Sequence, residues 1–68
     1  MREVAIRGDM IRLGQLLKLA GLADSGGDAR ALVEDGAVTV NGEVETRRGR
    51  QLHPGDVIAV AEDAVRIA

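Results

Sequence analysis

The fold is decided by the stretch Val38-Thr39-Val40-Asn41-Gly42-Glu43-Val44-Glu45. Two short β-forming segments flank Asn41-Gly42, the dipeptide preferred in a two-residue type I′ turn, because both turn positions need a positive φ. The alternation places Val38 and Val40 on the same face of the first segment. An antiparallel hairpin with one apolar face is therefore predicted, and the rest of the chain must cover that face.

Two amphipathic helices are predicted before the hairpin. The first is expected over residues 10–20, with Asp9 as its N-cap. Its apolar stripe has helical spacing and comprises Leu13, Leu16, Leu17 and Ala20. Its outer face is expected to carry Gly14, Gln15 and Lys18. The second helix begins after Ser25, which can cap it, and ends at Gly36. Its buried stripe is expected to be Ala29, Leu32 and Val33.

Three more strands are predicted, at Arg2–Arg7, Val57–Val60 and Val65–Ile67. The second follows a Pro-Gly turn at His53–Asp56. The order strand, helix, helix, hairpin, two strands predicts an α+β fold: two short helices packed on a small, mostly antiparallel sheet with an Asn-Gly hairpin. Residues 1–68 are expected to form one domain and a monomer.

The composition excludes several classes of protein. The 68 residues include no cysteine, no aromatic residue and one histidine, His53, which excludes zinc fingers, thiolate nucleophiles and aromatic base-stacking platforms. Neither a G-x-x-x-x-G-K phosphate loop nor a nucleophile elbow occurs. We therefore expect no enzyme activity, metal, cofactor or small-molecule substrate. No membrane span of about 18 apolar residues and no signal sequence is present, so a cytoplasmic protein is expected.

Charge is unevenly distributed along the chain. The net charge of −2 and the pI of 5.2 argue against a strongly basic nucleic-acid binder. However, Thr46–His53 contains three arginines and no acid, while four acids gather around the second helix. Charges more than about 8–10 Å apart are largely screened at physiological salt. An acidic total is therefore compatible with a local basic patch.

Arg47, Arg48 and Arg50 are the first candidates for a binding site, because guanidinium groups pair bidentately with phosphate oxygens. The alternative is an exposed loop whose charges serve solubility. Gly26-Gly27 at a helix start could expose N–H groups to a phosphate, or could form an entry loop that is already capped. Asn41 is expected to shape the hairpin tip, where it could also touch a ligand.

Four blocks of the sequence, in order and at the right spacing, resemble the S4 RNA-binding domain, also called the alpha-L motif. They are IRLGQLLK at 11–18, SGGDAR at 25–30, GAVTVNG at 36–42 and LHPGD at 52–56. The Gly26-Gly27 pair and ETRRGR at 45–50 are similar to small stand-alone bacterial members, the YbcJ-like proteins. The resemblance extends from Glu3 to about Val60.

The resemblance implies a protein that binds structured RNA, either ribosomal RNA or tRNA, and that associates with the ribosome. The implied RNA face, formed by both helices and the hairpin loop, comprises Arg12, Lys18, Gly26, Gly27, Arg30, Asn41, Arg47, Arg48 and Arg50. The chain departs from the family at Gly26, where many members have a basic residue. Without aromatic side chains, the contacts are expected to go to phosphates and to the shape of folded RNA.

A protein-interaction adaptor is the alternative, in which the fold is kept and RNA affinity is weak or lost. The partner surface would then consist of the acids around the second helix and Ile11 on the outer face of the first. Co-sedimentation with ribosomes distinguishes the two functions.

Overall fold

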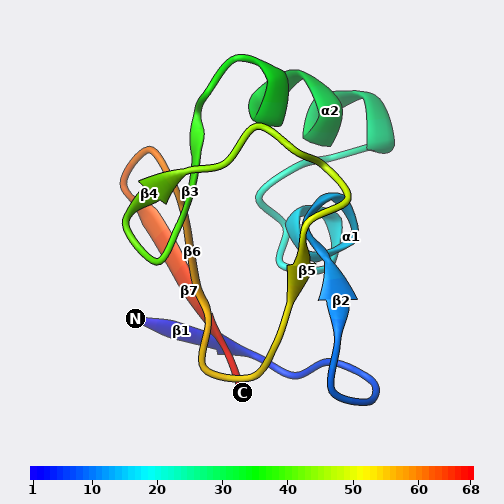
Figure 1. Ribbon diagram of the computed structural model, residues 1–68, viewed down its shortest axis with the longest axis vertical. Coiled ribbons are helices and arrows are strands. Elements are labelled where there is room, and N and C mark those ends of the chain that lie inside the picture. The colour runs from blue at the N-terminus through cyan, green and yellow to red at the C-terminus, as the bar shows by residue number, and fades with distance from the viewer.

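The computed structural model describes residues 1–68 and contains seven short strands and two helices (Figure 1). In chain order the elements are β1 (Arg2–Val4), β2 (Ile11–Arg12), α1 (Leu13–Leu19), α2 (Gly26–Glu34), β3 (Val38–Val40), β4 (Glu43–Val44), β5 (Gln51–Leu52), β6 (Val57–Val60) and β7 (Asp63–Ile67). The predicted α+β fold is confirmed. Neither helix has the length and apolar character that a bilayer crossing would require.

Five strands form one sheet in the order β1-β7-β6-β3-β4. β1 runs parallel to β7, and every other neighbouring pair is antiparallel. The predicted hairpin joins β3 to β4: Val40 pairs with Glu43, and the two turn residues have positive φ, 53° at Asn41 and 88° at Gly42. The turn chemistry thus sets the register that turns Val38 and Val40 toward the core.

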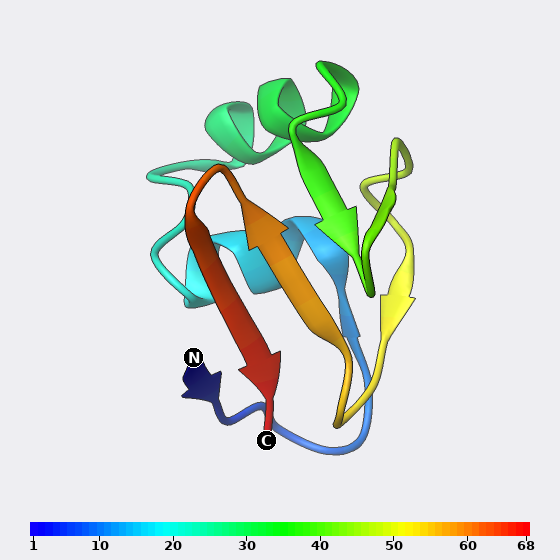
Figure 2. The same ribbon diagram turned by 90° about the vertical axis from the view of Figure 1, so that its left-hand side faces the viewer.

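Both helices lie on one side of this sheet, as Figure 2 shows, and together they enclose an aliphatic core. The predicted stripe of α1 is buried in full: Leu13, Leu16, Leu17 and Ala20. α2 contributes Ala29 and Val33, whereas Leu32 is half-buried. The sheet contributes Val38, Val40, Ile58, Val65 and Ile67. Ser25 caps α2 as predicted, because its Oγ accepts a hydrogen bond from the Asp28 N–H at 3.1 Å.

α1 begins at Leu13, three residues later than predicted, because the two residues before it form β2, which pairs with β5. Arg12 is the extended residue that precedes the helix (φ −85°, ψ 149°), so the prediction of Asp9 as N-cap was wrong. Ile11 also lies in β2, where it is half-buried and packs against the core. It is therefore not on the outer face of the first helix, as the adaptor hypothesis supposed.

The two terminal strands also differ from the prediction. β1 ends at Val4, and not at Arg7 as predicted. Val4 pairs with Ile67, which is the last residue of β7, so no strand residue remains for the following positions to pair with. β7 begins at Asp63, two residues early, because Val60 pairs with Asp63 across a tight turn in which Ala61 has a φ of +54°. The pairing of β1 with β7 places the first strand of the chain beside the last one (Figure 1).

Candidate nucleic-acid interface

Residues 46–50, here called the arginine loop, are docked on the start of α1. A helix leaves its first four N–H groups without partners inside the helix. In α1 the side chain of the N-cap residue Arg12 accepts none of them, and Gln15 Oε1 accepts only the Arg12 N–H, at 3.5 Å. The arginine loop supplies two of the missing acceptors: the Leu13 N–H donates to the Arg50 carbonyl at 2.9 Å, and the Gly14 N–H to the Arg48 carbonyl at 3.0 Å. Arg12 Nη1 adds a hydrogen bond to the Gly49 carbonyl at 2.8 Å. Loop and helix therefore hold each other in place.

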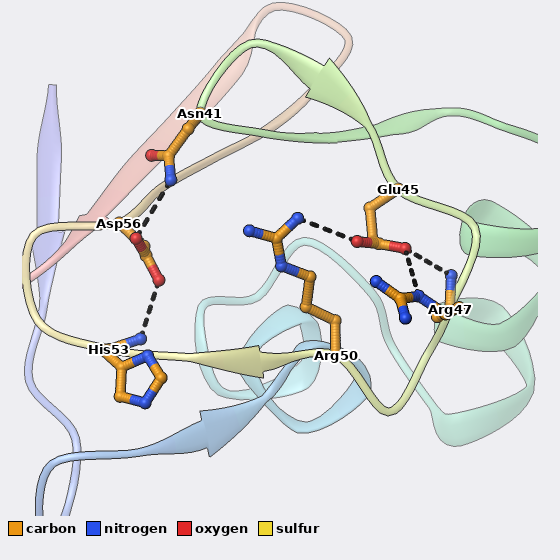
Figure 3. A network of polar contacts seen from close by, with 6 residues as sticks. All are labelled: Asn41, Glu45, Arg47, Arg50, His53 and Asp56. Atoms are coloured by element: carbon orange, nitrogen blue, oxygen red, sulfur yellow. Dashed lines mark hydrogen bonds and ion pairs between the residues drawn. The ribbon is translucent and has the colours of Figure 1, made fainter.

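Glu45 immediately precedes this loop and is buried, with 6% of its surface exposed. Its carboxylate accepts hydrogen bonds from Arg50 Nη1 at 2.9 Å, from the Arg47 N–H at 3.0 Å and from Arg47 Nε at 3.3 Å (Figure 3). The hydrogen bond from the Arg50 side chain is the largest of several influences that lower the pKa of Glu45 from 4.5 to about 2. Glu45 is therefore ionised across the physiological pH range.

The three hydrogen bonds of Glu45 to Arg47 and Arg50 are here called the Glu45 clamp. The clamp corrects the prediction that residues 46–53 form a basic patch in which all three arginines are available. The window contains no acid, but the residue just before it neutralises part of its charge. Arg47 and Arg50 both have a carboxylate partner in Glu45, whereas Arg48 forms no ion pair. Arg48 is thus the one arginine of the loop whose charge is not compensated inside the protein.

A groove runs between α1, α2 and the arginine loop. It is lined by Met10, Arg12, Gly14, Gln15, Lys18, Gly26, Ala29, Arg30, Val33, Glu34, Thr46, Arg48 and Gly49. Four of these residues are cations and only Glu34 is acidic. Arg30 is paired with Glu34 on the next turn of α2, at 3.0 Å. Three cations without a carboxylate partner remain, one each from β2, α1 and the loop: Arg12, Lys18 and Arg48.

The groove brings together five of the nine predicted site residues: Arg12, Lys18, Gly26, Arg30 and Arg48. A neighbouring hollow is lined by Arg47 and Arg50, and it shares Arg12 and Gly49 with the groove. Seven of the nine predicted residues therefore lie on one continuous surface. Gly27 is not among the residues that line the groove.

Asn41 does not line the groove either, and its side chain has a structural task at the hairpin tip. Its Nδ2 donates to Asp56 Oδ1 at 3.0 Å (Figure 3). Its Oδ1 accepts from the Val57 N–H at 2.9 Å. The pKa of Asp56 lies below its ordinary value, and the hydrogen bond from the Asn41 side chain is the largest cause. A second hydrogen bond, from the His53 N–H, lowers this pKa further. Asn41 thus ties the hairpin to the turn before β6.

Gly14, Gln15 and Thr46 line the groove but were missing from the predicted site. The prediction that Gly14 lies on an exposed outer face was wrong, because Gly14 is buried against the side chain of Arg48. A sequence signal existed: glycine inside a helix costs about 1 kcal/mol relative to alanine, a cost that close packing against another segment can offset.

The acids around α2 lie mostly outside the groove. Asp24, Asp28 and Asp35 are exposed and do not line it. No group of three or more His, Cys, Asp or Glu side chains is placed to hold a metal ion. The acids therefore lower the net charge of the chain without occupying the cationic groove.

Fold and groove together define a small α+β module that presents a concave cationic surface built from two helices and a loop. The chain belongs to the S4 domain family, whose pattern matches residues 4–68. The resemblance noted in the sequence is thereby confirmed.

Three proteins illustrate the relationship. A Bacillus subtilis (strain 168) protein named probable ribosome maturation protein RlbA is 46% identical over 57 residues, which span 84% of this chain and 80% of RlbA. YbcJ of Escherichia coli (strain K12) is 35% identical over 57 residues, 84% of this chain and 81% of YbcJ. A tyrosine–tRNA ligase of Moorella thermoacetica is 40% identical over 63 residues, which cover 81% of this chain and only 15% of that enzyme.

The solution structure of E. coli YbcJ has the same fold. It superimposes with a TM-score of 0.76 at 30% identity, and the match covers all of this chain and 87% of YbcJ. That structure is described as an alpha-L motif involved in RNA binding. The alignment over the full length of this chain confirms the architecture of two helices on a mostly antiparallel sheet.

Proposed function

We propose that this protein is a non-catalytic RNA-binding module whose groove holds the phosphate backbone of a structured RNA. One observation carries the proposal: three cations from β2, α1 and the arginine loop converge on a single groove without carboxylate partners. Since the net charge of the chain is −2, a groove with this local charge indicates recognition of an anion. Arginine and lysine contacts to phosphates supply most of the affinity of such interfaces.

Ribosomal RNA or tRNA is the target class that we favour. The relatives support it, since one is named a ribosome maturation protein, one is described as having an RNA-binding motif, and one is a ligase for tRNA. The chain contains no aromatic residue on which single-stranded bases could stack, so folded RNA recognised by shape and phosphates suits it better. Since both rRNA and tRNA act in the cytoplasm, we propose that the protein binds its RNA there. We further propose that it does so as a monomer whose residues 1–68 form one domain.

The test measures the affinity for a labelled tRNA transcript and a labelled small-subunit rRNA fragment as a function of salt. Three phosphate contacts predict a slope of log K against log salt of about −2.1 to −2.7, at roughly 0.7–0.9 per phosphate. The association constant should then fall about 20- to 40-fold between 50 and 200 mM salt. Polyuridine, as a single-strand control, should bind more weakly.

Variants separate a site from a general charge effect. Replacement of both Lys18 and Arg48 by alanine should reduce the slope by about 1.4–1.8. The matched control is Arg7→Ala combined with Arg66→Ala, which also removes two positive charges. Neither residue lines the groove, and Arg66, which is paired with Glu3, points away from the helices because it alternates with the buried Val65 and Ile67. Equal losses in both variants would show a general charge effect in place of a site. A wild type that remains at the top of a sucrose gradient at low salt while ribosomes sediment would favour the adaptor.

A further inference from the structure

Gly14 occupies a position on α1 where no side chain fits unless Arg48 moves. A Cβ built at Gly14 would lie 2.7 Å from Cγ and 3.2 Å from Cδ of Arg48. Cβ atoms in proteins essentially never approach other atoms closer than 3.0 Å. Any residue larger than glycine would therefore displace the Arg48 side chain from its place against the helix.

The backbone contact between the same two residues does not depend on glycine. The Gly14 N–H donates to the Arg48 carbonyl at 3.0 Å, and that carbonyl oxygen would be 3.7 Å from the added Cβ, an ordinary van der Waals distance. A substitution can thus leave the arginine loop docked while it moves the side chain alone.

The aliphatic part of Arg48 lies across α1 where the side chain of residue 14 would otherwise stand. Residues four apart in a helix lie one above the other on the same face, so this position is one turn before Lys18. Neither Arg48 nor Lys18 forms an ion pair within the protein, and both line the groove. Long side chains commonly bury their stems in this way and keep the charged end in solvent.

We propose that Gly14 is a positioning residue: its missing side chain lets the arginine loop place Arg48 on the groove face of α1, where Arg48 and Lys18 form a two-cation site in which each cation binds one RNA phosphate. The inference rests on the proposed function, because the site matters only if an RNA phosphate occupies it. Residue 14 thus controls RNA affinity through the position of Arg48, although glycine has no side chain that could contact RNA.

The experiment compares Gly14→Ala, Arg48→Ala and the double variant, with the labelled tRNA transcript as probe. Each single variant should lose one phosphate contact, which reduces the salt slope by about 0.7–0.9 and the affinity at 0.1 M salt about five- to eightfold. The double variant should bind like either single variant, because both changes remove the same contact. Gly14→Ala combined with Lys18→Ala, the matched control, should show the two losses multiplied together.

Two measurements on the free protein separate this inference from the proposed function. The wild type should show a nuclear Overhauser contact between the Gly14 Hα and Arg48 Hγ protons. Any stability lost in Gly14→Ala should be regained when Arg48→Ala is added, because alanine lacks the Cγ and Cδ atoms that would clash. If the wild type binds neither RNA, the proposed function fails even where this contact is seen. The positioning role is overturned if Gly14→Ala keeps the wild-type affinity and slope, if its loss adds to that of Arg48→Ala, or if the contact is missing.

Discussion

The substitution Glu45→Gln should increase RNA affinity, although it removes the charge of a buried carboxylate that accepts three hydrogen bonds. In the wild type, Glu45 holds Arg47 through two hydrogen bonds and Arg50 through one. Glutamine has nearly the same shape and can still accept hydrogen bonds, but it does not compensate the guanidinium charges. The two arginines differ in their access to a ligand, since the side chain of Arg47 is 79% exposed and that of Arg50 only 34%.

The expected magnitude follows from that difference in exposure. Arg47 becomes available to a phosphate, whereas Arg50 stays half-buried, so one contact is gained. The salt slope should steepen by about 0.7–0.9, and the affinity at 0.1 M salt should rise about five- to eightfold. Fluorescence anisotropy with the labelled tRNA transcript measures both quantities. An unchanged slope or weaker binding would refute the reasoning and show that ionised Glu45 orders the arginine loop for RNA instead of withholding Arg47 from it.

The same variant has a defined effect on stability in acid. The folded-state pKa of Glu45, about 2, lies below its ordinary value of 4.5, so its ionised form stabilises the fold above about pH 4.5. That contribution is lost as the pH falls from 4.5 toward 2. Urea unfolding should therefore find Glu45→Gln less stable than the wild type at pH 7, and the difference should shrink through that acid window. A difference that stays constant from pH 7 to pH 2 would contradict the clamp.

Three further changes test the fold. Arg50→Ala should lower the urea midpoint more than Arg47→Ala, because Arg50 is the less exposed partner of Glu45; the reverse order would contradict the clamp geometry. Leu16→Ala, at a fully buried position, should lower the free energy of unfolding by about 2–5 kcal/mol in urea unfolding. The total for a chain of this length is about 3–10 kcal/mol. A loss below about 1 kcal/mol would mean that α1 is not packed as described. Ala61→Gly should stabilise the protein by about 0.5–1 kcal/mol in thermal unfolding, since an L-residue at positive φ is strained by roughly 1–2 kcal/mol and glycine recovers part of it; destabilisation would indicate that this turn relaxes without glycine.

The groove also explains how an acidic chain can carry a cationic surface. Segment counting predicted a local basic patch, and the structure places three unpaired cations in one groove while three of the four acids around α2 lie outside it. Two of the arginines that suggested the patch are, however, held by Glu45. The run of arginines thus contributes only one free cation, Arg48, and the other two free cations of the groove, Arg12 and Lys18, come from other elements.

Local sequence patterns determined those features that depend only on neighbouring residues. The Asn41-Gly42 turn, the Ser25 cap and the helical spacing of the apolar stripe of α1 each act within a few residues, and each is found as predicted. Turn preference, capping and periodicity are physical properties of short segments. The family resemblance extended these local predictions to most of the chain, from Glu3 to about Val60, because its four blocks fix the order of the elements between residues 11 and 56.

Only the tertiary structure decided what forms between distant segments. β2 exists because residues 11–12 meet residues 51–52, which also delays the start of α1. The burial of Gly14 and the docking of the arginine loop depend on contacts between positions 14 and 48, and 13 and 50. No periodicity records such pairs, since hydrogen bonds and close packing across more than thirty residues arise only once the chain has folded. For this protein, sequence alone therefore identified the basic residues, and the fold decided which of them are free to bind.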